Sequence, residues 1–396
     1  MKILGELFTD FSRIDLDARG GYSRVAEVKA VNPSDGHLPQ RAFKLMRHEI
    51  DHQRTLARFL EEFRLLLDIC QDANPPKPVT RIYDSGFAPL ELSQTLHRNE
   101  PPDPKLKLIP TGLDISLFQK TGQELQQKEP ERWLPYLVME LAPYDDSLLR
   151  QIHHQPQDDF SGLYRLPTGE VIAMALQLLD VMDYLHKRHK RAYMDWKPEH
   201  LFWSGEKRQV KLIDWNVNTP LDDGPGERQN IRDDIRIFCG AALYISLTFI
   251  DPDEPSNTIG PRPTRELGTP VPEIRKRYWT DRPDFHQRGR MLDDNIKKII
   301  QKGLDPNQGF DTPQELRQTL LEYAQQELGM TAAELKPGAR PESEYFKALE
   351  AMRGAQAQLL QAQQNLIDAI GKHGETLEYN RLFETIKRAL KNFPIS

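Results

Sequence analysis

Cysteine is scarce in this chain of 396 residues, which contains only Cys70 and Cys239. Two cysteines cannot form a disulfide framework, so we expect the chain in a reducing compartment, the cytoplasm. No run of about 18 apolar residues occurs, which predicts that no helix spans a membrane. Residues 1–10 lack a basic region followed by a long apolar run, so we expect no signal peptide.

Basic residues are not in excess either. The formal net charge is −6 at pH 7 and the isoelectric point lies near 6.0. Proteins whose main ligand is nucleic acid carry a basic surplus, so we expect no nucleic-acid partner. The length is sufficient for two lobes and one additional element.

Two short motifs that contain aspartate carry the strongest chemical signal. Residues 193–203 read YMDWKPEHLFW, and residues 210–216 read VKLIDWN. Phosphoryl transfer needs one carboxylate to orient the attacking hydroxyl, a cation near the transferred group, and a second carboxylate to hold Mg²⁺ against the phosphates. Asp195, Lys197 and Asp214 are these residue types in this order.

Together the motifs resemble the catalytic loop, H-R-D-L-K-P-x-N, and the metal-binding turn, D-F-G, of eukaryotic-type protein kinases. The resemblance implies that Asp195 orients or deprotonates the hydroxyl and that Lys197 steadies the transferred group. It also implies that Asp214 holds a metal ion and that His200 replaces the Asn that binds a second Mg²⁺. Imidazole is a poor ligand for Mg²⁺, which indicates one metal or a weakened second site.

The residues upstream of these motifs extend the resemblance. Lys44 lies in the apolar run RAFKLM, like the V-A-I-K strand whose Lys holds the nucleotide phosphates. The helical pattern of residues 55–70 follows it, with Glu62 as the expected partner of Lys44 and Glu61 as the competing assignment.

The stretch ARGGYSRVAEVKA, residues 18–30, stands where the glycine-rich nucleotide loop of the family belongs. Its pattern, G-x-G-x-x-G-x-V, keeps only the central glycine here. The resemblance implies that Gly20, Gly21, Ser23 and Val25 cover the phosphates.

The sequence YLVMEL, residues 136–141, resembles the fifth strand and the hinge of the family. The resemblance implies that Met139 lies at the back of the adenine pocket. It also implies that Glu140, Leu141 and Ala142 offer backbone groups to the adenine edge.

The chain is therefore identified as an atypical, bacterial-type member of the eukaryotic-like (Hanks-type) Ser/Thr protein kinase family. The resemblance implies an α+β, bilobal protein-kinase-like fold with a β-rich N-lobe, 1–140, and a helical C-lobe, 141–330. A polar insert at about 88–133 interrupts the N-lobe. Residues 331–396 are expected to form a linker and a helical hairpin.

Two segments are candidates for binding partners. The insert is either a long loop or a docking surface for a protein substrate or partner. The hairpin has helical patterns between residues 344 and 393, which either pack on the C-lobe or form a coiled coil that makes an oligomer.

Several departures from the family pattern concern regulation. Met194 replaces the Arg that binds a phosphate on the activation segment, so no phosphate receiver is expected there. The segment 214–234 is short, contains Thr219 as its only hydroxyl residue, and has no A-P-E motif. Gly309 stands where the family has the Arg that pairs with the Glu of A-P-E, so both halves of this ion pair are missing.

Two further positions bear on the loops themselves. Asn216 replaces the Gly of D-F-G, and Asn tolerates left-handed backbone better than most residues. Asp234, or Asp233 in a shifted register, corresponds to the Asp that hydrogen-bonds the catalytic-loop backbone in the family.

The resemblance implies an ATP- and Mg²⁺-dependent kinase that phosphorylates a protein hydroxyl, with Mn²⁺ as an alternative ion. A second hypothesis is a pseudokinase that binds nucleotide and acts as a scaffold or sensor. A third is a small-molecule kinase of the same fold, which the short segment 214–234 favours and Lys197 disfavours.

Overall fold

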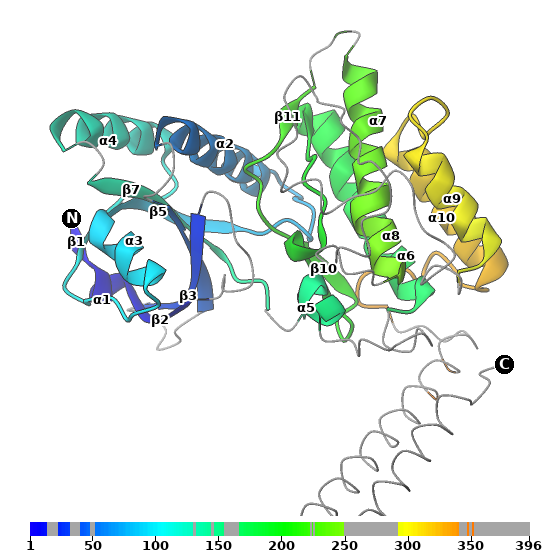
Figure 1. Ribbon diagram of the computed structural model, residues 1–396, viewed down its shortest axis with the longest axis horizontal. Helices are drawn as coiled ribbons and strands as arrows, with labels where there is room; N and C mark the ends of the chain where they lie inside the picture. Colours follow the sequence, from blue (N-terminus) through cyan, green and yellow to red (C-terminus); the bar gives the residue numbers. More distant parts are fainter. Residues whose placement is uncertain are drawn as a thin grey trace, which may run out of the picture.

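The computed structural model describes residues 1–13, 23–31, 40–47, 52–129, 132–143, 146–153, 166–221, 224, 226–248 and 292–339, and the single positions 347 and 351. The fold is α+β, as predicted: a curled antiparallel sheet with helices is followed by a largely helical part (Figure 1). Gly20 and Gly21 lie outside the described residues, as does almost all of the expected hairpin.

The sheet has seven strands in the order β1-β6-β5-β7-β4-β3-β2, and all its pairs are antiparallel. Alternating residues of β3, such as Ala26 and Val28, are buried, as expected for strands with one face on the core. The strands are β1 Lys2–Ile3, β2 Phe8–Arg13, β3 Ser23–Ala30, β4 Gln40–Met46, β5 Ile82–Pro89, β6 Lys107–Pro110 and β7 Trp133–Glu140.

Helix α2, His52–Gln71, carries the apolar face that the sequence indicated. Phe59, Phe63 and Leu66 on this face are almost completely buried. Figure 1 shows α2 and α4, Ile115–Lys128, along the same side of the sheet, and both helices contact β5 and β7. The short helix α1 is Leu4–Leu7.

The segment 88–133 is not a long loop. It forms α3, Leu90–His97, then β6 and α4, and β6 fills the sheet between β1 and β5. Several of its apolar residues are buried, among them Leu92, Leu108 and Phe118. The polar composition of this segment therefore gave little sign of its two helices and one strand. Such elements can pack with only one apolar face, so most of their residues can be polar.

The helical part is built around α6, Thr168–Tyr184, which is buried along almost its entire length. It continues into the π-helical turn η2, Leu185–His189. The remaining elements are α5 Leu148–His153, β8 Arg191–Ala192, η3 Pro198–His200, β9 Leu201–Ser204, β10 Gln209–Leu212, β11 Thr219–Pro220, α7 Glu227–Ile237, η4 Phe238–Leu243, α8 Tyr244–Thr248, α9 Asp294–Leu304 and α10 Pro313–Glu327.

The link between α2 and β5 joins the sheet to the helical part. Leu212 donates its backbone N–H to Pro78 O at 2.9 Å, and Lys211 pairs with Glu140 at 2.8 Å. At the end of α2, Asp72 accepts a hydrogen bond from the Tyr184 hydroxyl. These contacts place the end of β10 beside the link and the end of β7, and join the residue after α2 to the end of α6.

The chain after α10 remains packed on the helical part as far as residue 339. Leu335 is 3% exposed, and Gly338 donates its N–H to Lys207 O at 3.0 Å. The buried Arg208 donates through Nη1 to Glu334 O and, at 3.1 Å, to Ala339 O. The first residues of the expected linker thus complete the helical core. Among the described residues, no helix is both long and apolar enough to cross a membrane.

Candidate functional site

Three charged residues from distant elements meet between the sheet and the helical part. Lys44 Nζ, on β4, lies 2.8 Å from both carboxylate oxygens of Glu62, on α2, and 2.8 Å from Asp214 Oδ1, after β10. The side chains of Lys44 and Glu62 are 3% and 0% exposed, and that of Asp214 is 26% exposed. Glu61 is exposed, so Glu62 is the partner of Lys44.

Their mutual contacts determine which of these groups carry charge. Burial opposes the ammonium of Lys44, but the carboxylates of Asp214 and Glu62 outweigh it and raise the pKa of Lys44. Burial raises the pKa of Glu62, against the effect of Lys44. Burial also acts to raise the pKa of Asp214, yet Lys44 and His200 hold that pKa well below its usual value. The carboxyl group of Asp214 therefore stays ionised, and its side chain is the most exposed of the three.

Asp234, on α7, organises the loop that carries Asp195. Its carboxylate accepts from Met194 N at 2.8 Å, Tyr193 N at 3.2 Å and Trp196 Nε1 at 2.7 Å, and it contacts His186 Nε2 at 2.8 Å. Met194 has a φ of 63°, an uncommon conformation for a residue with a side chain. The hydrogen bonds to Asp234 hold this turn.

The hydroxyl of Tyr193 connects the two aspartate motifs. This hydroxyl is the donor to two backbone oxygens, Ile213 O at 2.6 Å and Asp214 O at 3.0 Å. The Tyr193 ring packs against Trp196 and Trp215, with centroids 4.7 and 5.1 Å away. Sequence reasoning did not predict this link, although an aromatic residue at the start of the first motif was its signal. Like Met194, Asp214 has a positive φ, of 61°.

Lys197 lies beside Asp195. Its Nζ is 2.6 Å from Glu199 Oε1 and 3.7 Å from Asp195 Oδ2. Burial acts to lower the pKa of Lys197, but Asp195 and Glu199 outweigh this and raise it. Glu199 was not among the predicted site residues, and its position within WKPEH was the only signal.

His200 lies between the two aspartates. Its Nδ1 is 3.1 Å from the backbone oxygen of Asp195, and its Nε2 is 3.3 Å from Asp214 Oδ2. One ligand atom from each of Asp195, His200 and Asp214 lies within 4.8 Å of the others. Two carboxylates and one imidazole at this spacing could hold a divalent metal ion.

The sheet places three further predicted residues, Ser23, Val25 and Met139, on the same face as Lys44. Val25 stands opposite Lys44 in the β3–β4 pair, so their side chains share a face, and Ser23 stands opposite Met46. Met139 is 5% exposed and pairs with Ala42.

The expected hinge residues follow Met139 at the end of β7. Glu140 donates its N–H to Arg81 O at 2.7 Å, and its carboxylate pairs with Lys211. Leu141 and the buried Ala142 continue the chain directly after the strand.

An ion pair links the start of α7 to the turn before α10. Asp311 Oδ2 lies 2.7 Å from Arg228 Nη2, and Asp311 Oδ1 lies 2.6 Å from Arg232 Nε. At Gly309 a Cβ atom would lie 2.6 Å from Asp305 O, which leaves no room for an arginine. The sequence lacks both members of the ion pair that the resemblance implies, a Glu before α7 and an Arg near position 309. The structure contains a different pair, with the arginines on α7 and the carboxylate before α10.

No protein-family model matches the chain.

Proposed function

We propose that this chain has a bilobal, protein-kinase-like fold and transfers the terminal phosphoryl group of ATP to a hydroxyl group of a protein. The observation that supports this most strongly is the contact of one lysine with two carboxylates from separate elements. Lys44 joins Glu62 and Asp214, which are 18 and 170 positions away in the chain. This arrangement suits a cation that positions nucleotide phosphates next to a metal-holding carboxylate.

The acceptor side of the site is formed by Asp195 and Lys197. In the proposed reaction, the acceptor oxygen bonds to the terminal phosphorus as the bond to the bridging oxygen breaks, and ADP leaves with that electron pair. Asp195 orients the hydroxyl and accepts its proton. Lys197, with a raised pKa, stays charged and offsets the negative charge of the transferred group.

The donor set fits a divalent ion as a cofactor of ATP, either Mg²⁺ or Mn²⁺. Asp214 and His200 would hold it, and Asp195, whose carboxylate lies within 4.8 Å of both, would keep its role toward the acceptor hydroxyl. When bound, such an ion neutralises negative charge on the phosphates. Imidazole is a poor ligand for Mg²⁺, so we expect a weakened Mg²⁺ site, and Mn²⁺ is the alternative ion to test beside it.

A second function is a nucleotide-binding scaffold without transfer. The observation that favours it is the close pairing of Lys197 with Glu199, at 2.6 Å, which competes with binding to a phosphoryl group. In either case, the acceptor or partner would dock through the segment 88–133 or through residues 344–393.

The test combines binding and transfer. Mg-ATP or Mn-ATP should stabilise the wild-type protein by about 2.7 kcal/mol at a concentration 100 times its dissociation constant. Asp195→Asn should keep this binding and lose transfer of radiolabelled phosphate, whereas Asp214→Asn should lose both. Asp294→Asn is the matched control, because that side chain is 85% exposed and far from the site in sequence.

Absence of a thermal shift at millimolar nucleotide would contradict both functions. Binding without any transfer, in the presence of the protein's own partners, would favour the scaffold.

A further inference from the structure

The α2 helix, which carries Glu62, is held from outside the site by a helix of the segment 88–133. Phe118, on α4, is 1% exposed and packs against two rings. Its centroid is 5.1 Å from that of Phe63 and 4.7 Å from that of Phe87. Phe63 directly follows Glu62, so α4 contacts α2 at the residue next to the one that pairs with Lys44.

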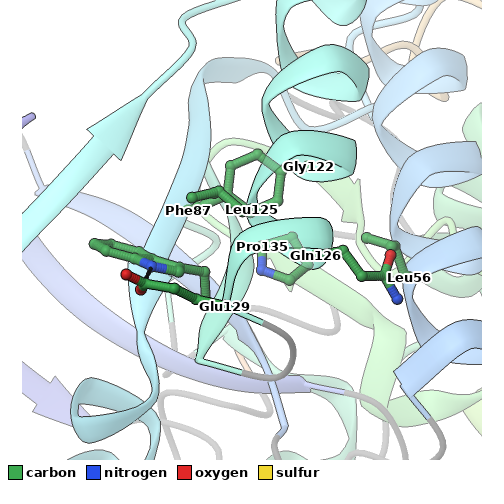
Figure 2. Close-up of a pocket in the computed structure, with 8 residues that line it drawn as sticks. Leu56, Phe87, Gly122, Leu125, Gln126, Glu129 and Pro135 are labelled. Atoms are coloured by element: carbon green, nitrogen blue, oxygen red, sulfur yellow. Dashed lines mark hydrogen bonds between the residues drawn. The ribbon is translucent and has the colours of Figure 1, made fainter.

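A glycine allows α4 to approach β5 this closely. A Cβ atom on Gly122, one helical turn after Phe118, would lie 3.0 Å from Phe87 Cζ and 3.4 Å from Cε1. Figure 2 shows Gly122 beside Phe87 in the pocket that α4 forms with α2, β5 and β7, and Leu56, Leu125 and Pro135 are among the other residues that line it. The N-terminus of α4 is capped by Asp114, which accepts from Leu117 N at 2.9 Å.

The C-terminal end of α2 also contacts the helical part, through Asp72. Asp72 accepts from the Tyr184 hydroxyl and pairs with Arg188 at 3.4 Å and His189 at 3.6 Å. Helix α2 is therefore fixed to the helical part at its C-terminal end and to α4 along its outer face.

We propose that α4 is a built-in positioning element and that Phe118 is its positioning residue, which holds Glu62 in contact with Lys44. The consequence for catalysis rests on the proposed function. A helix that is held in this way needs no phosphate on the segment 214–234 to bring Glu62 to Lys44. This agrees with Met194, whose thioether cannot bind a phosphate.

The test measures the Lys44–Glu62 contact itself, without nucleotide and without transfer. Lys44 is 3% exposed and in contact with Glu62, so it should react slowly with an amine-acylating reagent, as measured by mass spectrometry. Phe118→Ala should increase its labelling rate about tenfold or more, because an emptied aromatic site lowers the cost of releasing α2. Phe118→Leu should give a smaller increase.

Leu117→Ala is the matched control, since this neighbour on the same helix is 44% exposed. It should leave Lys44 labelling unchanged. Labelling of the fully buried Cys239 thiol reports global unfolding and should stay unchanged in Phe118→Leu. If Phe118→Ala does not fold, Phe118→Leu decides the question alone.

Transfer assays then separate the two proposals. Phe118→Ala, or Phe118→Leu if it alone folds, should lower kcat more than it raises KM for ATP, because Glu62 positions Lys44 in the transition state. Unchanged Lys44 labelling in folded Phe118→Leu and Phe118→Ala would overturn the role of α4, whatever the activity. Increased Lys44 labelling in the Phe118 variants, together with no phosphate transfer by the wild-type protein, would leave the role of α4 intact and contradict the proposed function.

Discussion

Asp311 accepts a hydrogen bond from Arg232, with Arg232 Nε 2.6 Å from Asp311 Oδ1. The cation stands on α7, within the short segment 214–234, and the carboxylate stands between α9 and α10. The ion pair that the kinase resemblance implies has the opposite order of charges. Residues 214–234 contain no A-P-E sequence and residue 309 is glycine, yet Arg228 and Arg232 connect these two regions through Asp311.

The first prediction concerns this pair and pH. Hydrogen bonds from Arg228 and Arg232 hold the pKa of Asp311 below its usual value. The pair therefore stabilises the fold above the unfolded pKa of about 3.9, and this stabilisation is lost as pH falls through the lower folded value. Asp311→Asn should lower Tm near neutral pH, and the difference from wild type should vanish in acid.

The same difference should shrink in about 1 M salt, because Arg228 is largely exposed and Asp311 is partly exposed. A Tm difference that persists at low pH and high salt would show that the pair is not electrostatic. Asp294→Asn provides the control for losing an exposed carboxylate.

The second prediction concerns the buried ion pair. Lys44→Met removes the ammonium beside the fully buried Glu62 and should lower the free energy of unfolding by about 3–5 kcal/mol. Lys44→Met combined with Glu62→Leu should cost less than the sum of the two single variants, because no carboxylate is then left at position 62. Urea unfolding measures all three.

The exposed Glu61→Gln should change stability by no more than about 0.5 kcal/mol. An effect of Glu61→Gln equal to that of Glu62→Gln would contradict the assignment of Glu62.

The third prediction concerns Asp234. Asp234→Ala leaves Tyr193 N, Met194 N and Trp196 Nε1 without their acceptor, at about 1–3 kcal/mol for each buried donor. We expect a strongly destabilised protein with altered tryptophan fluorescence, and an intermediate effect for Asp234→Asn. Asp183→Ala, at a partly exposed position on α6, should change little. Wild-type stability in Asp234→Ala would refute this role.

The fourth prediction concerns the C-terminal boundary of the folded core. A fragment of residues 1–340 should fold and bind nucleotide like the full chain, whereas 1–330 should be less stable. The shorter fragment lacks the buried Leu335 and the carbonyls that bind Arg208. Leu335→Ala in the full chain should cost about 2–5 kcal/mol.

Thermal unfolding compares the two fragments, and light scattering compares the mass of 1–340 with that of the full chain. A lower mass per particle for 1–340, beyond the deleted residues, would support the hypothesis that residues 344–393 make an oligomer. Equal stability of the two fragments would contradict the boundary.

The sequence alone supplied the residue types that the proposed chemistry needs, because that information is local. No tertiary contact is needed to recognise the residue types and their order around Asp195 and Asp214, or the apolar strand around Lys44. The α+β class and the apolar face of α2 were legible for the same reason, since periodicity reports which side of an element is buried.

Tertiary structure decided the choices between neighbours. Glu61 and Glu62, or Asp233 and Asp234, differ by one position, and both members of each pair are carboxylates. Composition cannot separate them, because only the rotation of the helix in the folded chain determines which carboxylate faces its partner.

Tertiary structure also decided every feature that joins distant segments. The link from Tyr193 to Ile213, the reversed pair at Asp311 and the contact of Phe118 with Phe63 depend on which surfaces meet. The segment 88–133 gave a weak signal because its polar residues face solvent, while a few apolar side chains supply its packing. A one-dimensional pattern records what each residue is, and packing free energy across the core determines what it touches.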